Sequence, residues 1–399
     1  MMQKLGRFIL AILAVWMVVC SVQADQYWDS SPTAGFQPGD GYWSTAASDT
    51  NWNNGAGNGG QSTWVNDGGS APFFPMNGGT SRVTISSSCI TGNYLRVTGA
   101  NYTIVQTNGG QLNCLYTGGN VFQIEASNNT WIVAGGSSSV TSILKTVRGG
   151  GSIYVGSLSA LSSNDVLTVD GGGVTNSAMV SNMGPGATYI GYIAGSLACG
   201  VNVVNGGYWY GGDINVGYPG ATNHYLNVDN GTVQMIGSLN IWGTAGRGVV
   251  KNGSRLNTGG GGSLQVGFNG SSSNCSLTVD GGVVSTLGSQ GTHLFGYSST
   301  LTITNGGLVT NGAGGGIVSV IGDTGSTNCT LIVAGGSSTQ SVWYLAGSTL
   351  TIGSTASSVG NVLRIDGAGS PGSAGVKNTG ASQNCGRFSK TTSGERVFL

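Results

Sequence analysis

The sequence predicts an all-β fold, a β-solenoid whose coils contain about 25 residues each. Glycine accounts for 75 of the 399 residues, and only 7% of residues are charged. Val, Ile, Thr and Tyr are frequent, which favours strands joined by Gly and Asn turns. Apolar phrases that end in glycine recur at a nearly constant spacing. Strict Gly-X-Y periodicity is missing and hydrophobic residues reach 39%, so neither collagen nor a disordered low-complexity chain fits this composition.

The chain begins with the pattern of an export signal. Lys4 and Arg7 precede an apolar run that ends at Cys20, and Ala24 closes a small-residue cleavage site. Residues 1–24 are therefore expected to be a signal peptide. Because the apolar run is too short to span a bilayer, we expect an extracellular or cell-surface protein with no retained transmembrane helix.

Residues 25–85 form a distinct tryptophan-rich segment, which we expect to cap the stack. The open end of a solenoid leaves apolar surface and strand edges uncovered, and large rings can cover both. The alternative is that spaced tryptophans stack on sugar rings. Trp43 and Trp52 are the candidate carbohydrate contacts of this segment.

Residues 86–365 contain the repeats, in which two phrases alternate. One is an apolar triplet closed by glycine, as in INVG ending at Gly217, and the other is LTVDGG from Leu277 or a variant of it. A period near 25 residues with occasional insertions predicts stacked coils. The glycines that close the first phrase are Gly156, Gly191, Gly217, Gly243, Gly267, Gly296, Gly322 and Gly347.

Each unit has room for about three short strands, which predicts one turn of a solenoid. Period two places Leu277 and Val279 inside and Thr278 and Asp280 outside. A single coil buries too few apolar side chains to be stable alone, so stability must come from stacking. The alternative is a meander of hairpins on Asn-Gly and Asp-Gly turns, but the segments after these turns do not mirror the strands before them.

Three of the units resemble a known bacterial repeat. VGYPGATNHYLNVDNGTV, VGFNGSSSNCSLTVDGGVVS and IGDTGSTNCTLIVAGG are similar to the repeat associated with type V secretion autotransporters and PEP-CTERM surface proteins. The resemblance covers roughly residues 150 to 365. It implies a right-handed parallel β-helix at the cell surface, with no assigned chemistry. Residues 366–399 do not match the family's anchors and are expected to form an irregular tail, so release, anchoring and truncation all stay open.

The cysteines test this register. Cys199, Cys275 and Cys329 each lie two residues before a predicted strand, in coils too far apart for bridging, so we expect buried free thiols. Cys89 and Cys114 are 25 residues apart and are the one candidate disulfide. Cys199 with His224 supplies only two metal ligands, short of a zinc tetrahedron. We expect no metal and no cofactor.

Asparagines recur next to these cysteines. Asn223, Asn274 and Asn328 are expected to line one edge as a ladder of stacked amides. A polysaccharide-facing edge is the alternative.

The charges exclude some functions. Basic and acidic residues balance at zero net charge, and without a dense basic patch we expect no nucleic-acid partner. Asp170, Asp229 and Asp280 recur in the repeat as turn residues rather than as a carboxylate cluster. We therefore expect no enzyme and no catalytic residue.

The strongest candidate contact is the YWY phrase. Alternation puts Tyr208 and Tyr210 on one face and Trp209 on the other, so the two tyrosines could form a platform for sugar or protein. The alternative is that they cover neighbouring coils together with Tyr192 and Tyr218. We expect a structural or adhesive surface rod whose partners are polysaccharide or other surface proteins. The alternatives are a carbohydrate-binding module and, less favoured, a polysaccharide-degrading enzyme.

Overall fold

The computed structural model describes most of the chain after residue 24. The described ranges are 25–53, 60–66, 70–75, 79–91, 94–107, 109–116, 118–146, 151–156, 162–268, 271–288, 290–312, 317–336, 339–367, 373–378, 388–390 and 396–398. The signal peptide predicted for residues 1–24 lies outside them. Within these ranges, no helix has the length and apolar character needed to cross a membrane.

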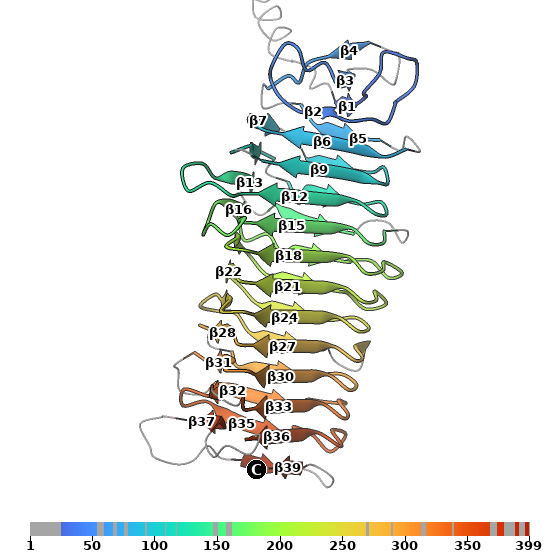
Figure 1. The fold of residues 1–399 in the computed structure, drawn as a ribbon. Coiled ribbons are helices and arrows are strands. Elements are labelled where there is room, and N and C mark those ends of the chain that lie inside the picture. The colour runs from blue at the N-terminus through green and yellow to red at the C-terminus, as the bar shows by residue number, and fades with distance from the viewer. Residues whose placement is uncertain are drawn as a thin grey trace, which may run out of the picture.

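The described chain winds as a parallel β-helix, and Figure 1 shows its coils stacked into a rod. Each strand of the stack pairs with the third strand before it and the third after it, so one turn of the chain adds one strand to each of three sheets. Central pairs such as β15 with β18 and β18 with β21 are parallel and keep their register. The predicted solenoid is confirmed, and the hairpin meander is wrong.

The 15-stranded sheet is called sheet A, the 13-stranded sheet B and the 11-stranded sheet C. Sheet A contains β1 (Gln26–Trp28), β3 (Trp52–Asn53), β4 (Gln61–Ser62), β5 (Pro72–Phe74), β8 (Leu95–Val97), β11 (Asn120–Ile124), β14 (Ser152–Val155), β17 (Thr188–Ile190), β20 (Ile214–Val216), β23 (Leu239–Ile241), β26 (Leu264–Val266), β29 (Thr292–Leu294), β32 (Val318–Ile321), β35 (Thr349–Ile352) and β38 (Phe388–Lys390). Sheet B contains β2 (Gly41–Tyr42), β6 (Ser81–Ile85), β9 (Tyr102–Gln106), β12 (Thr130–Ala134), β15 (Val166–Asp170), β18 (Gly200–Val204), β21 (Tyr225–Asp229), β24 (Arg247–Lys251), β27 (Ser276–Asp280), β30 (Thr300–Thr304), β33 (Thr330–Ala334), β36 (Val362–Asp366) and β39 (Arg396–Phe398). Sheet C contains β7 (Ser88–Thr91), β10 (Gln111–Cys114), β13 (Ser142–Thr146), β16 (Ala178–Asn182), β19 (Tyr208–Gly211), β22 (Thr232–Met235), β25 (Arg255–Thr258), β28 (Val283–Thr286), β31 (Leu308–Thr310), β34 (Ser341–Tyr344) and β37 (Ala374–Lys377).

The core follows the predicted alternation. In β27, Leu277 and Val279 are buried at 1% and 0% exposure, and the residues beside them are half-buried. Leu277 lies in register with Gly248 and Leu301, and Val279 lies in register with Val250 and Ile303. One continuous apolar core therefore runs through the rod.

The repeated glycines close the coil just after the sheet A strand. Seven of the eight predicted closures lie there with positive φ, for example Gly217 at 81° and Gly267 at 87°. This left-handed conformation suits glycine because it has no Cβ. Gly347 is the exception, because it precedes β35, and Gly353 at 68° occupies the equivalent place. The sequence alone could not separate Gly347 from Gly353, because each of these glycines follows an apolar run.

The predicted ladder of Asn223, Asn274 and Asn328 is wrong. These residues lie in alternate coils, separated by Ala245 and Ser298, so their amides are not neighbours. What they share is a left-handed backbone, with φ between 55° and 60°, which Asn tolerates better than most residues. An amide ladder does form at the same turn near the N-terminus, where Asn164 donates to Asn128 at 3.2 Å.

The tryptophan-rich segment lies at one end of the rod (Figure 1). Trp28, Trp43, Trp52 and Trp64 pack together, with ring centroids 4.8–5.5 Å apart in the close pairs. Strands β3 and β4 run antiparallel and end the parallel stack at this side. The stack itself begins before residue 86, because β5 and β6 already pair in parallel with β8 and β9.

The segment 366–399 is not simply an irregular tail. Its strands β37, β38 and β39 add a further strand to sheets C, A and B. The sequence did not predict these strands because the repeated phrases stop before them. A short strand such as AGVK still pairs with the preceding strand of its sheet. Sheet A therefore has thirteen parallel strands besides β3 and β4, which gives a rod about 60 Å long at about 4.8 Å per strand.

Candidate functional site

Two of the four predicted contact residues are inaccessible. Trp43 and Trp52 are both 0% exposed, because they pack against each other, Trp64 and Phe74 in the cap. A side chain without exposed surface cannot stack on a sugar ring. The structure therefore contradicts their assignment as carbohydrate contacts, and their role is to fill the end of the core.

Tyr208 and Tyr210 lie on the outer side of sheet C. Trp209 between them points inward and is 0% exposed, while both tyrosines are half-buried. Their neighbours in register are Met179 and Thr232 for Tyr208, and Ser181 and Gln234 for Tyr210. The predicted orientation is confirmed, but the two tyrosines do not join Tyr192 and Tyr218, which belong to turns beside sheet A.

A different set of residues, which the sequence did not single out, forms a register column on the outer side of sheet A. The column carries rings and amides in consecutive coils, while the residues beside it point into the core. We call it the sheet A column. Its members are Tyr27, Phe73, Arg96, Gln123, Tyr154, Tyr189, Asn215, Asn240, Gln265, His293, Val320 and Thr351.

Further aromatic rings flank the middle of this column. Together with the column from Tyr154 to His293, we call them the sheet A strip; they are Tyr192, Tyr218, Trp242, Phe268 and Phe295. Ring centroids are 4.9 Å apart between Tyr154 and Tyr189, and 4.7 Å between Tyr189 and Tyr192. Tyr192 lies 4.9 Å from Tyr218, and Trp242 lies 4.6 Å from Phe268. The rings thus form two continuous contact series along the rod.

The amides of the strip lie between these rings. Asn215 and Asn240 expose only 5% and 7% of their surface, whereas Tyr218 exposes 39%. Asn240 Nδ2 donates to Asn215 Oδ1 at 2.9 Å. Asn240 Oδ1 is buried and accepts no bond from the described residues, and the ring nitrogens Trp242 Nε1 and His293 Nδ1 are also buried without a hydrogen-bond partner among them. A buried polar group without a partner costs about 1–3 kcal/mol, so these groups favour a hydrogen-bonding ligand that they can turn to meet.

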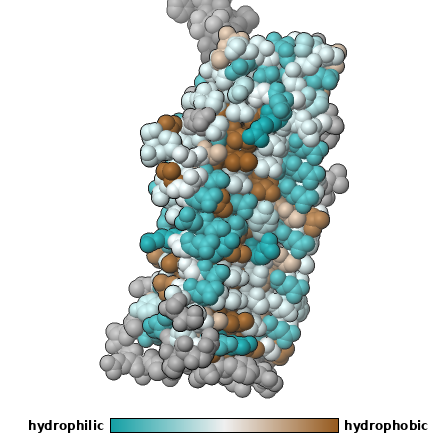
Figure 2. Space-filling view, in the orientation of Figure 1, coloured by the Kyte–Doolittle hydropathy of each residue, from teal (hydrophilic) through white to brown (hydrophobic). Residues whose placement is uncertain are grey.

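The strip is electrically neutral. Its residues are Tyr, Asn, Gln, Trp, Phe and His, and burial lowers the pKa of His293, which favours the uncharged imidazole. Burial also raises the pKa values of Tyr154 and Tyr189, which keeps both phenols protonated. On the face drawn in Figure 2, hydrophobic patches alternate with hydrophilic residues instead of forming a broad apolar belt.

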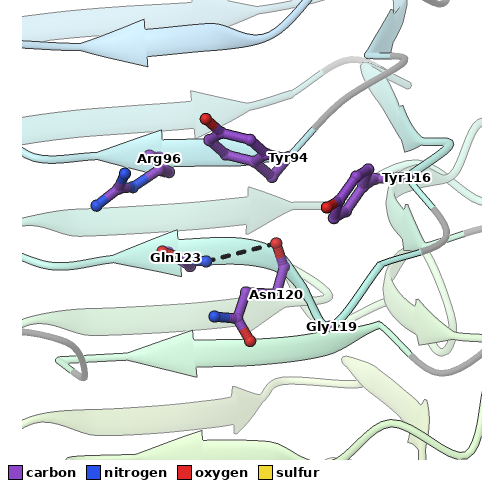
Figure 3. A pocket seen from close by; sticks show the side chains of 6 residues that line it. All are labelled: Tyr94, Arg96, Tyr116, Gly119, Asn120 and Gln123. Atoms are coloured by element: carbon purple, nitrogen blue, oxygen red, sulfur yellow. Dashed lines mark hydrogen bonds between the residues drawn. The ribbon is translucent and has the colours of Figure 1, made fainter.

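A pocket of about 330 Å³ continues the same side of sheet A toward the cap. Tyr94, Arg96, Tyr116, Gly119, Asn120 and Gln123 line it (Figure 3). The centroids of the two tyrosine rings are 5.8 Å apart, with 71° between their planes. Arg96 lies over the Tyr94 ring at 5.9 Å and forms a two-bond ion pair with Glu125.

A second column of buried side chains lies directly before the sheet B strands, one residue closer than the sequence predicted. Cys199, for example, immediately precedes β18. All members are 0–1% exposed. We call this the turn column; it contains Asn129, Asp165, Cys199, His224, Cys275, Ser299, Cys329 and Asn361.

The turn column binds backbone N–H groups. Asn129 N donates to Asp165 Oδ1 at 2.9 Å, and Cys199 N donates to His224 Nδ1 at 3.0 Å. Cys329 N donates to Asn361 Oδ1 at 3.0 Å in the same way. A side chain in one coil thus accepts a bond from the coil before it.

Asp165, Cys199 and His224 are residue types found in catalytic triads, but their geometry is structural. His224 Nδ1 is occupied by the backbone of Cys199, and Nε2 lies 3.1 Å from both Ser196 oxygens. Burial raises the pKa of the Cys199 thiol to about 12, so no thiolate forms near neutral pH. Burial also raises the pKa of Asp165 to about 8 and lowers that of His224 to about 4.

The cysteine predictions are settled by register. Cys199, Cys275 and Cys329 are buried and free, as expected. Cys89 and Cys114 lie in adjacent coils, but Cys89 pairs in register with Leu112 and Cys114 with Thr91. This two-residue offset separates their Cα atoms by about 8 Å, beyond the reach of a disulfide, and both thiols are free.

The repeated aspartates accept bonds from the next coil. Asp170 accepts from Asn205 at 3.1 Å, and Asp280 accepts from Asn305. Within the described ranges, no group of three or more His, Cys, Asp or Glu side chains is arranged to hold a metal ion.

No protein-family model, curated protein or solved structure matches the chain.

Proposed function

We propose that this chain is an exported, non-enzymatic adhesive rod that binds a neutral polysaccharide along the sheet A strip. The observation that carries the proposal is the alignment of aromatic rings and amides in successive coils, where Asn240 also keeps a buried oxygen without a partner among the described residues. Flat rings stack on the apolar faces of sugars, and amides exchange hydrogen bonds with hydroxyl groups. A coil spacing of about 4.8 Å is close to the length of one sugar ring, so an extended polymer could meet a similar surface at each coil.

The export pattern of residues 1–24 and the resemblance to surface-protein repeats support a location outside the cell. A stacked rod also suits this setting, because its length grows with the number of coils while its cross-section stays constant.

The charges favour a neutral polymer over an acidic one. Uronate polymers and nucleic acids require cations placed along the binding face, and the strip from Tyr154 to His293 contains no Lys or Arg among its members. Arg96 lies beyond the strip and is already paired with Glu125 at 2.7 Å.

A non-enzymatic role is favoured because the repeated aspartates Asp170 and Asp280 each end a strand in a separate coil. Glycoside hydrolysis needs two carboxyl groups on opposite sides of one bond. Asp170 and Asp280 instead belong to different coils, and each is bonded to an asparagine.

The test is depletion binding of the mature chain to cellulose, xylan, mannan and chitin, with polygalacturonate as the acidic comparison. A Tyr218→Ala/Trp242→Ala variant removes two strip rings. At about 0.5–1.5 kcal/mol for each ring contact, loss of both rings should weaken binding about 5-fold to 150-fold. The matched control is Tyr208→Ala/Tyr210→Ala on sheet C, which should bind like the parent.

The proposal fails if no neutral polymer binds or if polygalacturonate is preferred. If instead the Tyr208/Tyr210 variant loses binding and the strip variant keeps it, the contact lies on sheet C.

A further inference from the structure

The pocket between β8 and β11 differs from the strip because a residue from a turn adds to the lining that the sheet A side provides. Arg96 comes from β8 and Tyr94 immediately precedes this strand. Asn120 and Gln123 come from β11 in the next coil, and Tyr116 comes from the turn after β10. Figure 3 shows the two tyrosine rings on one side and the Gln123 and Asn120 amides below them. Its volume of about 330 Å³ lies at the small end of ligand pockets, about 300–1,000 Å³.

The Gln123 amide is loosely held. Its Nε2 donates one long bond, 3.4 Å, to the Asn120 carbonyl. Its Oε1 is buried and accepts no bond from the described residues, although the side chain lines the pocket. Turning this amide toward a hydroxyl group in the pocket would therefore break little and satisfy a buried acceptor.

The cation in the pocket wall is already neutralised. Arg96 Nε and a terminal nitrogen donate to the two carboxylate oxygens of Glu125 at 2.9 and 2.7 Å. This hydrogen-bonded pair raises the pKa of Arg96. An acidic ligand would have to compete with Glu125 for the same guanidinium, whereas a neutral ligand would leave the pair intact.

Gly119 keeps the pocket open. A Cβ placed on Gly119 meets no atom within 4 Å, so a larger side chain can be accommodated there by the empty space alone. Because Gly119 lines the pocket, a larger side chain there is a way to narrow the pocket with no clash at its Cβ.

We propose that this pocket is a subsite for a single neutral pyranose ring, at the end or branch of a polysaccharide whose chain lies along the sheet A strip. The inference rests on the proposed function. The pyranose ring packs against Tyr94 and Tyr116, and its hydroxyl groups bond to Gln123 and Asn120. The pocket accommodates one ring, whereas the strip contacts many.

The experiment is saturation-transfer NMR on the mature chain. The probes are the methyl glycosides of glucose, galactose, mannose, xylose and N-acetylglucosamine, with methyl glucuronide as the charged comparison. Gly119→Leu should abolish transfer to the probe that binds. Gln123→Leu should weaken its binding about fivefold, the effect of one hydrogen bond.

Two controls separate this subsite from the strip and from folding. Gly375→Leu has equally open space around its Cβ but lies in β37 of sheet C, and it should bind like the parent. The Tyr218→Ala/Trp242→Ala variant should keep the monosaccharide signal while losing polymer binding.

The inference is overturned if no neutral glycoside shows transfer, if Gly119→Leu leaves the signal unchanged, or if methyl glucuronide binds best. Polymer binding that survives these results would leave the proposed function standing. A monosaccharide signal that depends on Gly119, without any polymer binding, would instead refute the proposed function and still support the pocket as a monosaccharide site.

Discussion

The turn column predicts an unusual dependence of stability on pH, which the substitution Asp165→Asn should remove. Asp165 is 0% exposed, and its pKa is raised from 3.8 to about 8 by burial. Between these pH values the folded state keeps a proton that the unfolded state has lost, so stability falls as pH rises. At 1.36 kcal/mol per pKa unit, the loss amounts to at most about 6 kcal/mol.

His224 has the opposite effect. Burial lowers its pKa from 6.5 to about 4, so the unfolded state binds the extra proton between these values, and stability rises with pH by about 3 kcal/mol. From pH 4 to 6.5 the two slopes cancel. The parent chain should therefore show a plateau there and lose about 2 kcal/mol between pH 6.5 and 8 from these two groups.

Asp165→Asn should be tolerated because the chain already uses asparagine in this role. Asn129 Oδ1 accepts from Tyr102 N, and Asn361 Oδ1 accepts from Cys329 N. The variant should gain stability over the parent as pH rises from 4 to 8. The reverse substitution, Asn361→Asp, should introduce the same loss at a second coil.

The assay is urea unfolding at each pH, followed by tryptophan fluorescence. Trp131 and Trp209, in the coils on either side of Asp165, are fully buried and report on this region. Differences in midpoint between variant and parent, multiplied by the m-value, give the change in unfolding free energy. A difference that stays constant from pH 4 to 8 would mean that Asp165 is ionised in the folded state, and the reasoning would be refuted.

Three further outcomes follow from packing and burial. Trp52→Ala should lower stability by about 3–5 kcal/mol by opening a cavity in the cap, visible as an earlier urea midpoint and weaker near-ultraviolet circular dichroism; an unchanged midpoint would contradict the cap. Gly191→Ala should destabilise the fold because its Cβ would lie 2.2 Å from the His224 ring at a φ of 69°; adding His224→Ala should restore part of the loss, and no restoration would mean that the ring is not the obstacle. Cys199 should resist thiol reagents in the native chain and react in urea, since burial raises its pKa to about 12; rapid native labelling would show that the turn column opens.

The sequence predicted the coil because the coil is encoded locally. Each inward pair such as Leu277 and Val279 lies in one strand, and each closing glycine lies a few residues away. The free thiols of Cys275 and Cys329 also followed, because these residues lie two coils apart, which is too far for a disulfide. The offset between Cys89 and Cys114 did not follow, since it depends on where β7 and β10 begin, which spacing alone does not reveal.

The sheet A column was missed because its members are not related by a phrase. Tyr154 and Tyr189 are 35 residues apart, whereas Asn215 and Asn240 are 25 apart, and only the strand register shows that all four occupy one position. The tryptophans failed as contacts for a different reason. A ring near the end of a stack can either face solvent or cover the core. In this chain β3 and β4 close the end of sheet A, and the Trp43 and Trp52 rings are buried there.

The distribution of aromatic rings argues that the strip has a role beyond stacking. Positions that close the coil repeat in nearly every coil, as the left-handed glycines and the inward Leu and Val residues do. The outer rings of sheet A do not repeat in this way, because the column ends in Val320 and Thr351, which bring no ring, and these coils still pair in register. Coil stacking therefore does not require the rings. The coils of β32 and β35 lack these rings, whereas the rings of the strip gather on one face of sheet A from β14 to β29, so what that face contacts explains them better than stacking does.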